Sequence, residues 1–173
     1  PVTLWDIHGQ SGHPLRTTIR EMGPLLLGSL LELTDSQQSA LYATFKVADR
    51  EGLLLLDLKD LKALLNHLRY HPELLGDDAA LMTTGSSQAL LRRLAVLEQQ
   101  GAEALFGEPA LQLEDILQPA SDGRGRIHLL DASRLVHEAP KVYATFLLWL
   151  LAELFEQLPE RGDADKPLLA LFF

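Results

Sequence analysis

The sequence predicts an α/β fold in which a few parallel strands carry a large helical insertion. Strand-like apolar runs lie near both ends of the chain, a leucine-rich stretch lies between them, and a long apolar helix precedes the last run. A strand, a helical crossover and a second strand form a parallel sheet. We expect three parts, which are a core strand and edge segment (1–20), a helical insertion (21–118) and a second core region (119–173).

The composition fits one globular domain. The chain has 173 residues, of which 47% are hydrophobic, and a formal net charge of −9. This charge opposes a broad nucleic-acid-binding face. The absence of Cys excludes disulfides, thiolate zinc sites and a Cys nucleophile, and suits a cytoplasmic protein. The longest apolar stretch, 142–152, is shorter than the ~20 residues that span a bilayer, so we expect no membrane contact.

The chain opens with a short strand and a loop. Residues 2–7 are compatible with a β-strand, and residues 8–14 are rich in Gly, Ser and Pro, which favour a loop. The β-branched residues of 15–19 then predict a second, short edge strand.

The leucine-rich stretch predicts a series of helices with recognisable starts. Thr34 and Gln37 have the spacing of a capping box, Asp57 is suited to begin the next helix, and Ser86 or Ser87 to cap the last one. The expected helices cover residues 25–33 with Pro24 in the first turn, 34–52, 58–71 and 86–101, with a polar connection over 77–85.

The last part returns to an α/β pattern. Residues 122–125 predict a turn and 126–130 a strand. Pro140 begins a helix that reaches about residue 158 and is apolar nearly all round, which predicts deep burial. A loop over 162–167 precedes a final strand, 168–173.

The two chain ends predict an excised internal piece. The chain begins without Met and stops at Phe173 inside an apolar run with no polar tail. We therefore expect that chemistry of the longer polypeptide can lie outside these residues.

Histidines suggest two metal sites, each with a simpler interpretation. His67 and His71 are spaced i, i+4 and are followed by Glu73, which could place two imidazoles and a carboxylate on one face. No third ligand has a recognisable spacing, so a solvated helix end is the preferred interpretation. His137 and Glu138 lack the second His of a zincin helix.

Other motifs have similarly weak signals. His8 and His13 flank glycines after a strand, but no GxGxxG or GxxxxGK[ST] phosphate loop is present, so a packed loop is preferred. Residues 85–87 do not form a nucleophile elbow, because no strand precedes them. Arg124 and Arg126 could touch phosphate as an arginine finger, although a tight turn with exposed arginines is preferred.

An acidic stretch could bind a cation but lacks the spacing of a calcium loop, so helix caps and a solvated face are expected. Its residues are Asp49, Glu51, Asp57 and Asp60.

Seven long and unusual strings support a family resemblance. They are LWDIHG (4–9), GHPLR (12–16), MGPLLL (22–27), EGLLLLDLKDL (51–61), LEQQGAE (97–103), FGEP (106–109) and LLWLLAELFEQLP (147–159). Together they resemble the bacterial YjgR-type branch of the HerA-like P-loop ATPases. The resemblance covers almost the whole chain, and 69–85 fits it worst.

This resemblance implies a partial RecA-like P-loop NTPase core of the HerA/FtsK kind, whose relatives are ATP- and Mg²⁺-dependent motors. They form rings, often hexamers, and act on DNA. The resemblance places the phosphate-binding loop upstream of this chain, and makes 168–173 the Walker B strand with its acidic residues after Phe173. No catalytic, cofactor-binding or metal residue is therefore assigned within the chain, and the chain alone is predicted to be inactive.

Two alternatives to a motor segment stay open. The acidic, leucine-rich block 21–118 could be a helical protein-interaction module without ATPase activity, which exposed apolar faces would favour. A metal-dependent hydrolase would rest only on scattered His and Asp residues and is the weakest of the three.

Overall fold

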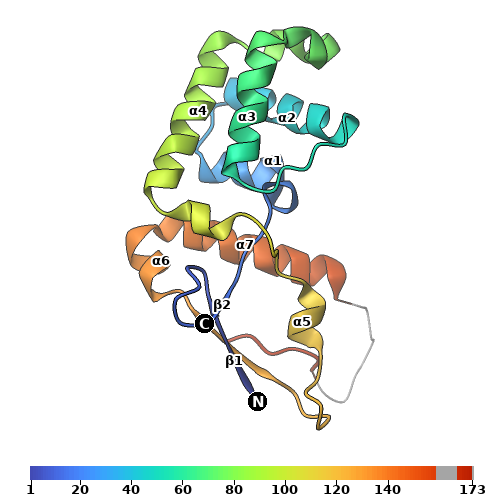
Figure 1. The fold of residues 1–173 in the computed structure, drawn as a ribbon, viewed down its shortest axis with the longest axis vertical. Coiled ribbons are helices and arrows are strands. Elements are labelled where there is room, and N and C mark those ends of the chain that lie inside the picture. Colours follow the sequence, from blue (N-terminus) through green and yellow to red (C-terminus); the bar gives the residue numbers. More distant parts are fainter. Residues whose placement is uncertain (159–166, 173) are drawn as a thin grey trace.

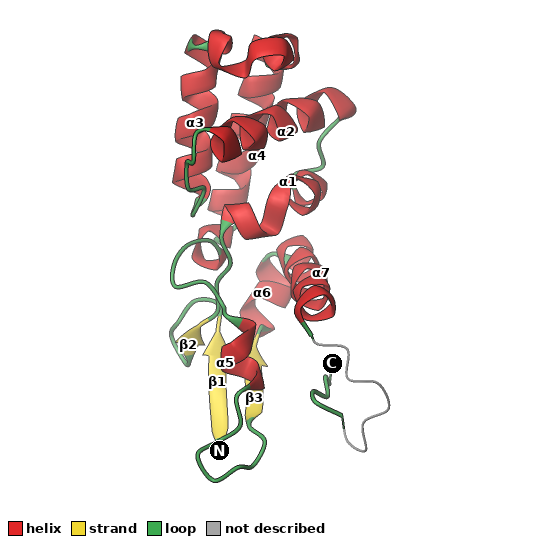
Figure 2. Cartoon of the chain, turned by 90° about the vertical axis from the view of Figure 1, so that its right-hand side faces the viewer, coloured by secondary structure: helices red, strands yellow, loops and turns green. Residues whose placement is uncertain are grey.

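The computed structural model describes residues 1–158 and 167–172. Helices α1–α4 form an elongated helical lobe, and the strands lie at the opposite end of the molecule with α5–α7 beside them (Figures 1 and 2). The elements in chain order are β1 (Val2–Asp6), β2 (His13–Pro14), α1 (Ile19–Leu30), α2 (Asp35–Arg50), α3 (Leu58–Tyr70), the 3₁₀ segment η1 (Pro72–Leu81), α4 (Thr84–Gln99), the 3₁₀ segment η2 (Ala102–Leu105), α5 (Leu113–Leu117), β3 (Ile127–Asp131), α6 (Ser133–Glu138) and α7 (Pro140–Gln157).

The strands form a small parallel sheet with the order β2-β1-β3. The register between β1 and β3 runs from Val2 opposite Ile127 to Asp6 opposite Asp131. The carboxyl ends of these strands point toward the helical lobe (Figure 2). A mixed α/β fold with parallel strands, as the sequence predicts, is confirmed.

Leucines at helical spacing build the core of the helical lobe. In α3, Leu61, Leu65 and Leu68 are fully buried, and they face α4, where Leu90 and Leu94 are also fully buried. The stripe predicted from the sequence therefore packs as expected for an amphipathic helix.

The predicted capping box of the second helix is confirmed, whereas the predicted cap of the last helix in the lobe is wrong. Thr34 and Gln37 make the reciprocal hydrogen bonds of a capping box at the start of α2. The N-cap of α4 is Thr83, whose Oγ1 accepts a hydrogen bond from the backbone N–H of Ser86 at 3.1 Å. Ser86 thus lies inside the helix and is not its cap.

The predicted edge strand over 15–19 is wrong, because β2 comprises only His13–Pro14 and Thr18 is the N-cap of α1. Two backbone hydrogen bonds from Ile19 and Arg20 to the segment after α2 hold this helix start in place. Tertiary contacts thus overrule the β propensity of the threonines.

Two predicted boundaries in the lobe also change. Helix α1 begins at Ile19, more than a turn before the expected start, and breaks at Gly23, whose φ of 72° is not helical, so Pro24 begins the second half of the helix. It ends at Leu30 and does not reach residue 33. The connection expected over 77–85 is largely the 3₁₀ segment η1, with a break at Gly76.

Helix α7 occurs where the sequence predicts it, but it is not buried all round. Val142, Phe146 and Trp149 face the core, whereas Leu148 is 55% exposed and Phe155 is 88% exposed. Part of the apolar surface of this helix is therefore left exposed by the described part of the molecule.

The predicted final strand is not formed in the described residues. Residues 167–172 have no strand conformation and lie apart from the sheet in Figure 2. A strand requires a neighbour to pair its backbone groups, and an apolar composition alone does not supply one. Phe173 and nearly all of the loop predicted over 162–167 lie outside the described residues.

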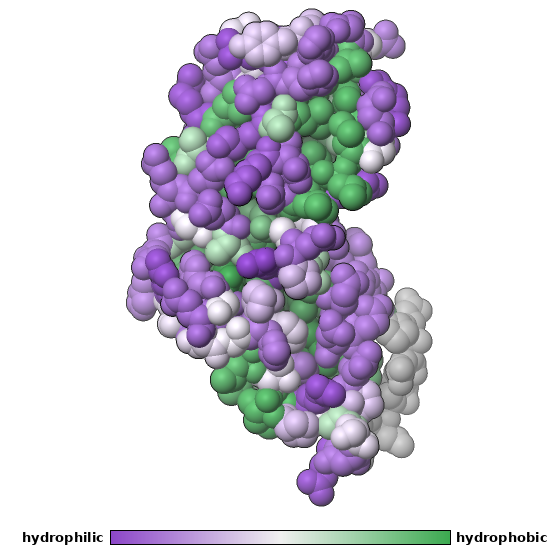
Figure 3. Space-filling model, viewed as in Figure 1, coloured by the Kyte–Doolittle hydropathy of each residue, from purple (hydrophilic) through white to green (hydrophobic). Residues whose placement is uncertain are grey.

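One face of the sheet is open in the described structure. Val2, Leu4, Ile127 and Leu129 point to this face and are 50–58% exposed. Figure 3 shows apolar side chains gathered over β1 in the lower part of the molecule. Parallel sheets are normally covered on both faces, so this face lacks the cover that its composition requires.

Candidate functional site

The carboxyl edge of the sheet is the candidate functional site. Asp6 and Asp131 end β1 and β3 and are directly opposite each other in the register. In open parallel sheets, ligands bind outside the carboxyl ends of the strands. Here this edge faces the helical lobe, and it is the part of the fold most suited to chemistry.

Asp6 organises the loop that follows β1. Its carboxylate is buried and accepts backbone hydrogen bonds from His8 at 2.9 Å, Gln10 at 2.8 Å and Ser11 at 2.9 Å. Burial acts to raise the pKa of Asp6, but these backbone donors outweigh it and lower the pKa below its ordinary value. Asp6 is therefore a structural carboxylate with little capacity left for a ligand.

Asp131 is more accessible than Asp6. The hydroxyl and backbone N–H of Ser133 donate to its Oδ1 at 2.6 and 3.0 Å. These hydrogen bonds lower the pKa of Asp131, so the carboxylate is ionised at neutral pH. It presents a negative charge at the edge and can contact a cation or a donor group there.

Sequence reasoning missed the roles of Asp6 and of a Trp5–His128 contact. The indole N–H of Trp5 donates to Nδ1 of His128 at 2.9 Å and joins β1 to β3. An Asp directly before a Gly-rich loop is a recognisable turn signal that could have revealed the first role. No local pattern could have revealed the second, because the two residues are 123 positions apart.

The segment that follows β1 contacts Trp5 through the ring of His13, in β2. The rings of Trp5 and His13 lie 5.9 Å apart at a tilt of 57°. His8 and His13 belong to no group of three or more ligating side chains placed to hold a metal ion among the described residues.

The histidines of the helical lobe form a close pair of tilted rings at the end of α3. The rings of His67 and His71 are 4.5 Å apart, and Nδ1 of His71 lies 3.0 Å from Oε1 of Glu73. Within residues 1–158 and 167–172, no group of three or more His, Asp or Glu side chains is placed to hold a metal ion. His137 is exposed at the end of α6, and its neighbour Glu138 pairs with Arg134.

The acidic stretch contains the predicted helix cap, and two of its carboxylates form ion pairs that the sequence did not predict. Asp49 pairs with Arg20 at 3.1 Å, and Glu51 pairs with Arg50 at 2.8 Å. Asp57 and Asp60 form the capping box of α3.

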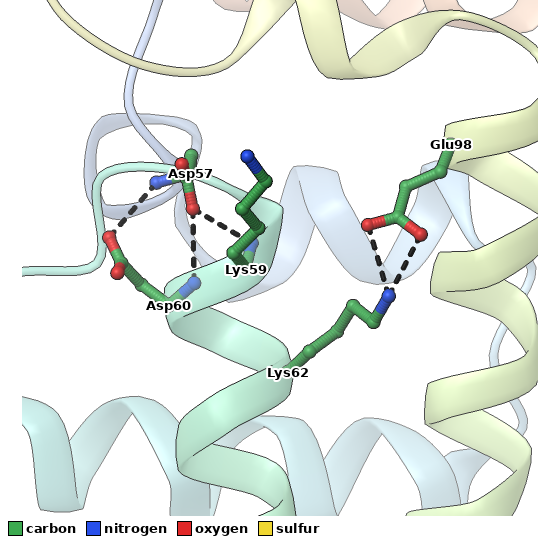
Figure 4. A network of polar contacts seen from close by, with 5 residues as sticks. All are labelled: Asp57, Lys59, Asp60, Lys62 and Glu98. Atoms are coloured by element: carbon green, nitrogen blue, oxygen red, sulfur yellow. Dashed lines mark hydrogen bonds and ion pairs between the residues drawn. The ribbon is translucent and has the colours of Figure 1, made fainter.

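Figure 4 shows this capping box and a neighbouring ion pair. Oδ1 of Asp57 accepts from the backbone N–H groups of Lys59 at 2.8 Å and Asp60 at 3.0 Å. Nearby, Nζ of Lys62 lies 2.8 and 3.1 Å from the two carboxylate oxygens of Glu98 and joins α3 to α4. Among the described residues, the carboxylates of this stretch therefore serve as caps and ion-pair partners of the helical lobe.

Replacing Asp57 with Ala should lower the free energy of unfolding by about 1 kcal/mol, because two N–H groups of the first turn lose their acceptor. Urea unfolding followed by circular dichroism measures this loss. The exposed neighbour Lys59 provides the control, since Lys59→Ala should change stability by less than about 0.5 kcal/mol. Equal effects of the two substitutions would contradict the capping role.

The arginines near β3 lie at a tight turn, as the preferred interpretation expected. Arg124 is exposed and lies 3.9 Å from Asp122, and Gly123 has a φ of 76°. Arg126 is also exposed and precedes β3. Both side chains are accessible, and their action on phosphate stays a prediction.

The serines of residues 85–87 are structural. Ser86 and Ser87 are buried in the first turn of α4, and Ser87 donates to the carbonyl of Thr84 at 3.1 Å. They have no catalytic arrangement in the described structure.

A separate surface groove lies on the helical lobe, between α1 and α2. It is lined by Arg20, Pro24, Tyr42, Phe45, Lys46 and Asp49. This groove involves none of the residues at the carboxyl edge of the sheet.

Comparison with known proteins places the chain in a family. The model of the helicase HerA-like C-terminal family matches residues 1–173. No curated protein and no solved structure matched the chain. Among the described residues, no helix has both the length and the apolar composition needed to cross a membrane. Because the match extends over the whole sequence, the chain belongs to the helicase HerA-like C-terminal family.

Proposed function

We propose that this chain is a segment of a HerA/FtsK-type helicase-like P-loop ATPase of the bacterial YjgR-type branch. The observation that carries the proposal is the family match over residues 1–173. The parallel sheet, with its carboxyl edge toward the helical lobe, supports it, because P-loop ATPases bind nucleotide at that edge of a parallel sheet.

The proposed architecture is a partial RecA-like core with a helical insertion. Its parts are 1–20, 21–118 and 119–173. The run 168–173 acts as the Walker B strand when the core is complete. In the complete core, further secondary structure packed on the open sheet face would bury the apolar side chains of that face.

ATP and Mg²⁺ are the proposed cofactors of the longer polypeptide. The 173 residues contain no GxxxxGK[ST] loop, so the phosphate-binding Lys and the magnesium carboxylate have to come from elsewhere. We assign no catalytic, cofactor-binding or metal residue to this chain. The proposed assembly is a cytoplasmic homo-oligomeric ring, such as a hexamer, which moves DNA through contacts outside this segment.

The chain alone should show no site-specific ATP turnover, whereas a polypeptide that adds the P-loop and Walker B residues should hydrolyse ATP. Phosphate release with and without Mg²⁺ measures both activities. The longer polypeptide with its P-loop Lys replaced by Ala is the control. Failure of the intact longer polypeptide to turn over ATP would contradict the proposed function.

The chain should also bind duplex DNA poorly, even at low salt, because its net charge is −9. A filter-binding curve at two salt concentrations tests this. Micromolar affinity that weakens steeply with salt would show that a local basic patch outweighs the net charge.

The second candidate function is a helical protein-interaction module. Exposed apolar side chains on the helical lobe favour it, namely Leu25 at 67%, Leu53 at 43% and Leu54 at 64%. Figure 3 shows apolar side chains over the loop that follows α2. Nucleotide-dependent ring formation by the longer polypeptide discriminates the two, since a motor requires neighbouring subunits and an adaptor does not.

A further inference from the structure

A side-chain hydrogen bond between two aromatic rings adds to the backbone pairing of β1 and β3. The indole Nε1–H of Trp5 donates to Nδ1 of His128 at 2.9 Å. The two rings are stacked, with centroids 6.0 Å apart and an interplanar angle of 24°. This contact lies on the face opposite the open one, because Trp5 and His128 alternate with the exposed residues of β1 and β3.

The direction of this hydrogen bond specifies the protonation state of His128. An indole N–H can only donate, so Nδ1 of the imidazole has to be unprotonated. The ring is therefore neutral, with its proton on Nε2. Nε2 is buried and has no acceptor at hydrogen-bond geometry among the described residues, although the nearby backbone carbonyl of Ile116 in α5 acts weakly on the ring.

The surroundings of His128 do not support an imidazolium. Burial and, to a lesser degree, the charge of Arg126 lower the pKa of His128 below its ordinary 6.5. The other titratable side chain near the pair is His13, whose ring lies beside the ring of Trp5. The carboxylates of α5, Glu114 and Asp115, are exposed, and neither is among the groups that shift the pKa of His128 in the described structure.

We propose that the Trp5–His128 contact is a proton-operated latch between β1 and β3. Protonation of Nδ1 removes the acceptor and directs one N–H group at another. It also creates a cation that is partly buried beside Arg126. The latch opens as a result, Trp5 becomes more hydrated, and the contact between β3 and the segment that contains α5 loosens.

The sign of the pH dependence follows from the neutral folded state. The unfolded chain protonates His128 as pH falls through about 6.5, while the folded chain resists until a lower pH. The stabilisation by the latch is therefore complete above pH 6.5 and is lost between that pH and the lower folded pKa. This inference concerns the sheet alone and does not depend on ATPase function.

Fluorescence of Trp5 tests the latch. The chain has two Trp residues, so Trp149→Phe leaves Trp5 as the single reporter. Between pH 8 and 5, its emission should change in a one-proton transition with a midpoint below 6.5 and shift to longer wavelength. Adding His128→Gln, whose amide oxygen can accept from the indole, should remove the transition. Adding His13→Gln instead should leave it in place.

Two outcomes would overturn the proposal. One is a transition that persists in His128→Gln, and the other is a transition that His13→Gln alone removes. Should Trp149→Phe fail to fold, ¹⁵N NMR of the unsubstituted chain replaces the fluorescence. The latch requires an Nδ1 resonance typical of an unprotonated acceptor at pH 7.5, together with a Trp5 indole N–H signal that shifts as His128 titrates. A protonated Nδ1 at pH 7.5 would contradict it.

Discussion

Replacing Phe146 with Ala should lower the free energy of unfolding by about 3–5 kcal/mol. Phe146 is fully buried in α7, where its ring lies 5.8 Å from that of Trp149. Helix α7 packs against both α1 and α6, so it joins the helical lobe to the region of the sheet. Removal of the ring leaves a cavity at this junction, which the surrounding helices can fill only in part.

The same helix supplies the matched control. Phe155 is 88% exposed, and Phe155→Ala should change stability by less than about 0.5 kcal/mol. Urea unfolding of both variants at one pH gives the comparison. A larger loss at Phe155 than at Phe146 would mean that α7 docks through its opposite face.

Replacing Gly12 with Ala should destabilise the protein by about 2–3 kcal/mol. A Cβ at this position would lie 2.6 Å from the backbone oxygen of Leu4 and 3.0 Å from the backbone N of Trp5. These atoms belong to β1, which pairs with β3 over its whole length, so they cannot move independently. The pairing between β1 and the two residues of β2 should be lost first.

Gly125 is the control for this substitution, because nothing lies within 4 Å of a Cβ built there. Gly125→Ala should be neutral or slightly stabilising, since Ala restricts the unfolded chain. Thermal unfolding ranks the two variants, and amide exchange at Leu15, which donates to the carbonyl of Asp6, reports on β2. Equal stability of the two variants would contradict the close approach of Gly12 to β1.

Local signals predicted the helices of the lobe well. The capping box of Thr34 and Gln37, the leucine stripe of α3 and the start of α7 at Pro140 all depend on residues close in sequence. Interactions within one or two turns are sufficient to specify such features, because the spacing of 3.6 residues brings them together.

Predictions that required a partner were less successful. The predicted strand 168–173 has a strand-like composition, but residues 168–172, its described part, have no strand conformation. The run 15–19 has β propensity, yet Thr18 caps a helix there. A strand depends on pairing with distant residues, and composition does not report whether such a partner is present.

The sequence by itself determined the mixed α/β class, the helices of the lobe, the absence of a phosphate loop and the family resemblance, which the match over residues 1–173 confirms at the level of the family. Tertiary structure alone decided that Trp5 contacts His128 and that one side of α7 stays exposed. The physical reason is the distance along the chain between the residues that interact. Periodicity and caps act between neighbours along the chain, whereas the Trp5–His128 contact arises only when the register of β1 and β3 brings residues 123 positions apart into hydrogen-bond distance.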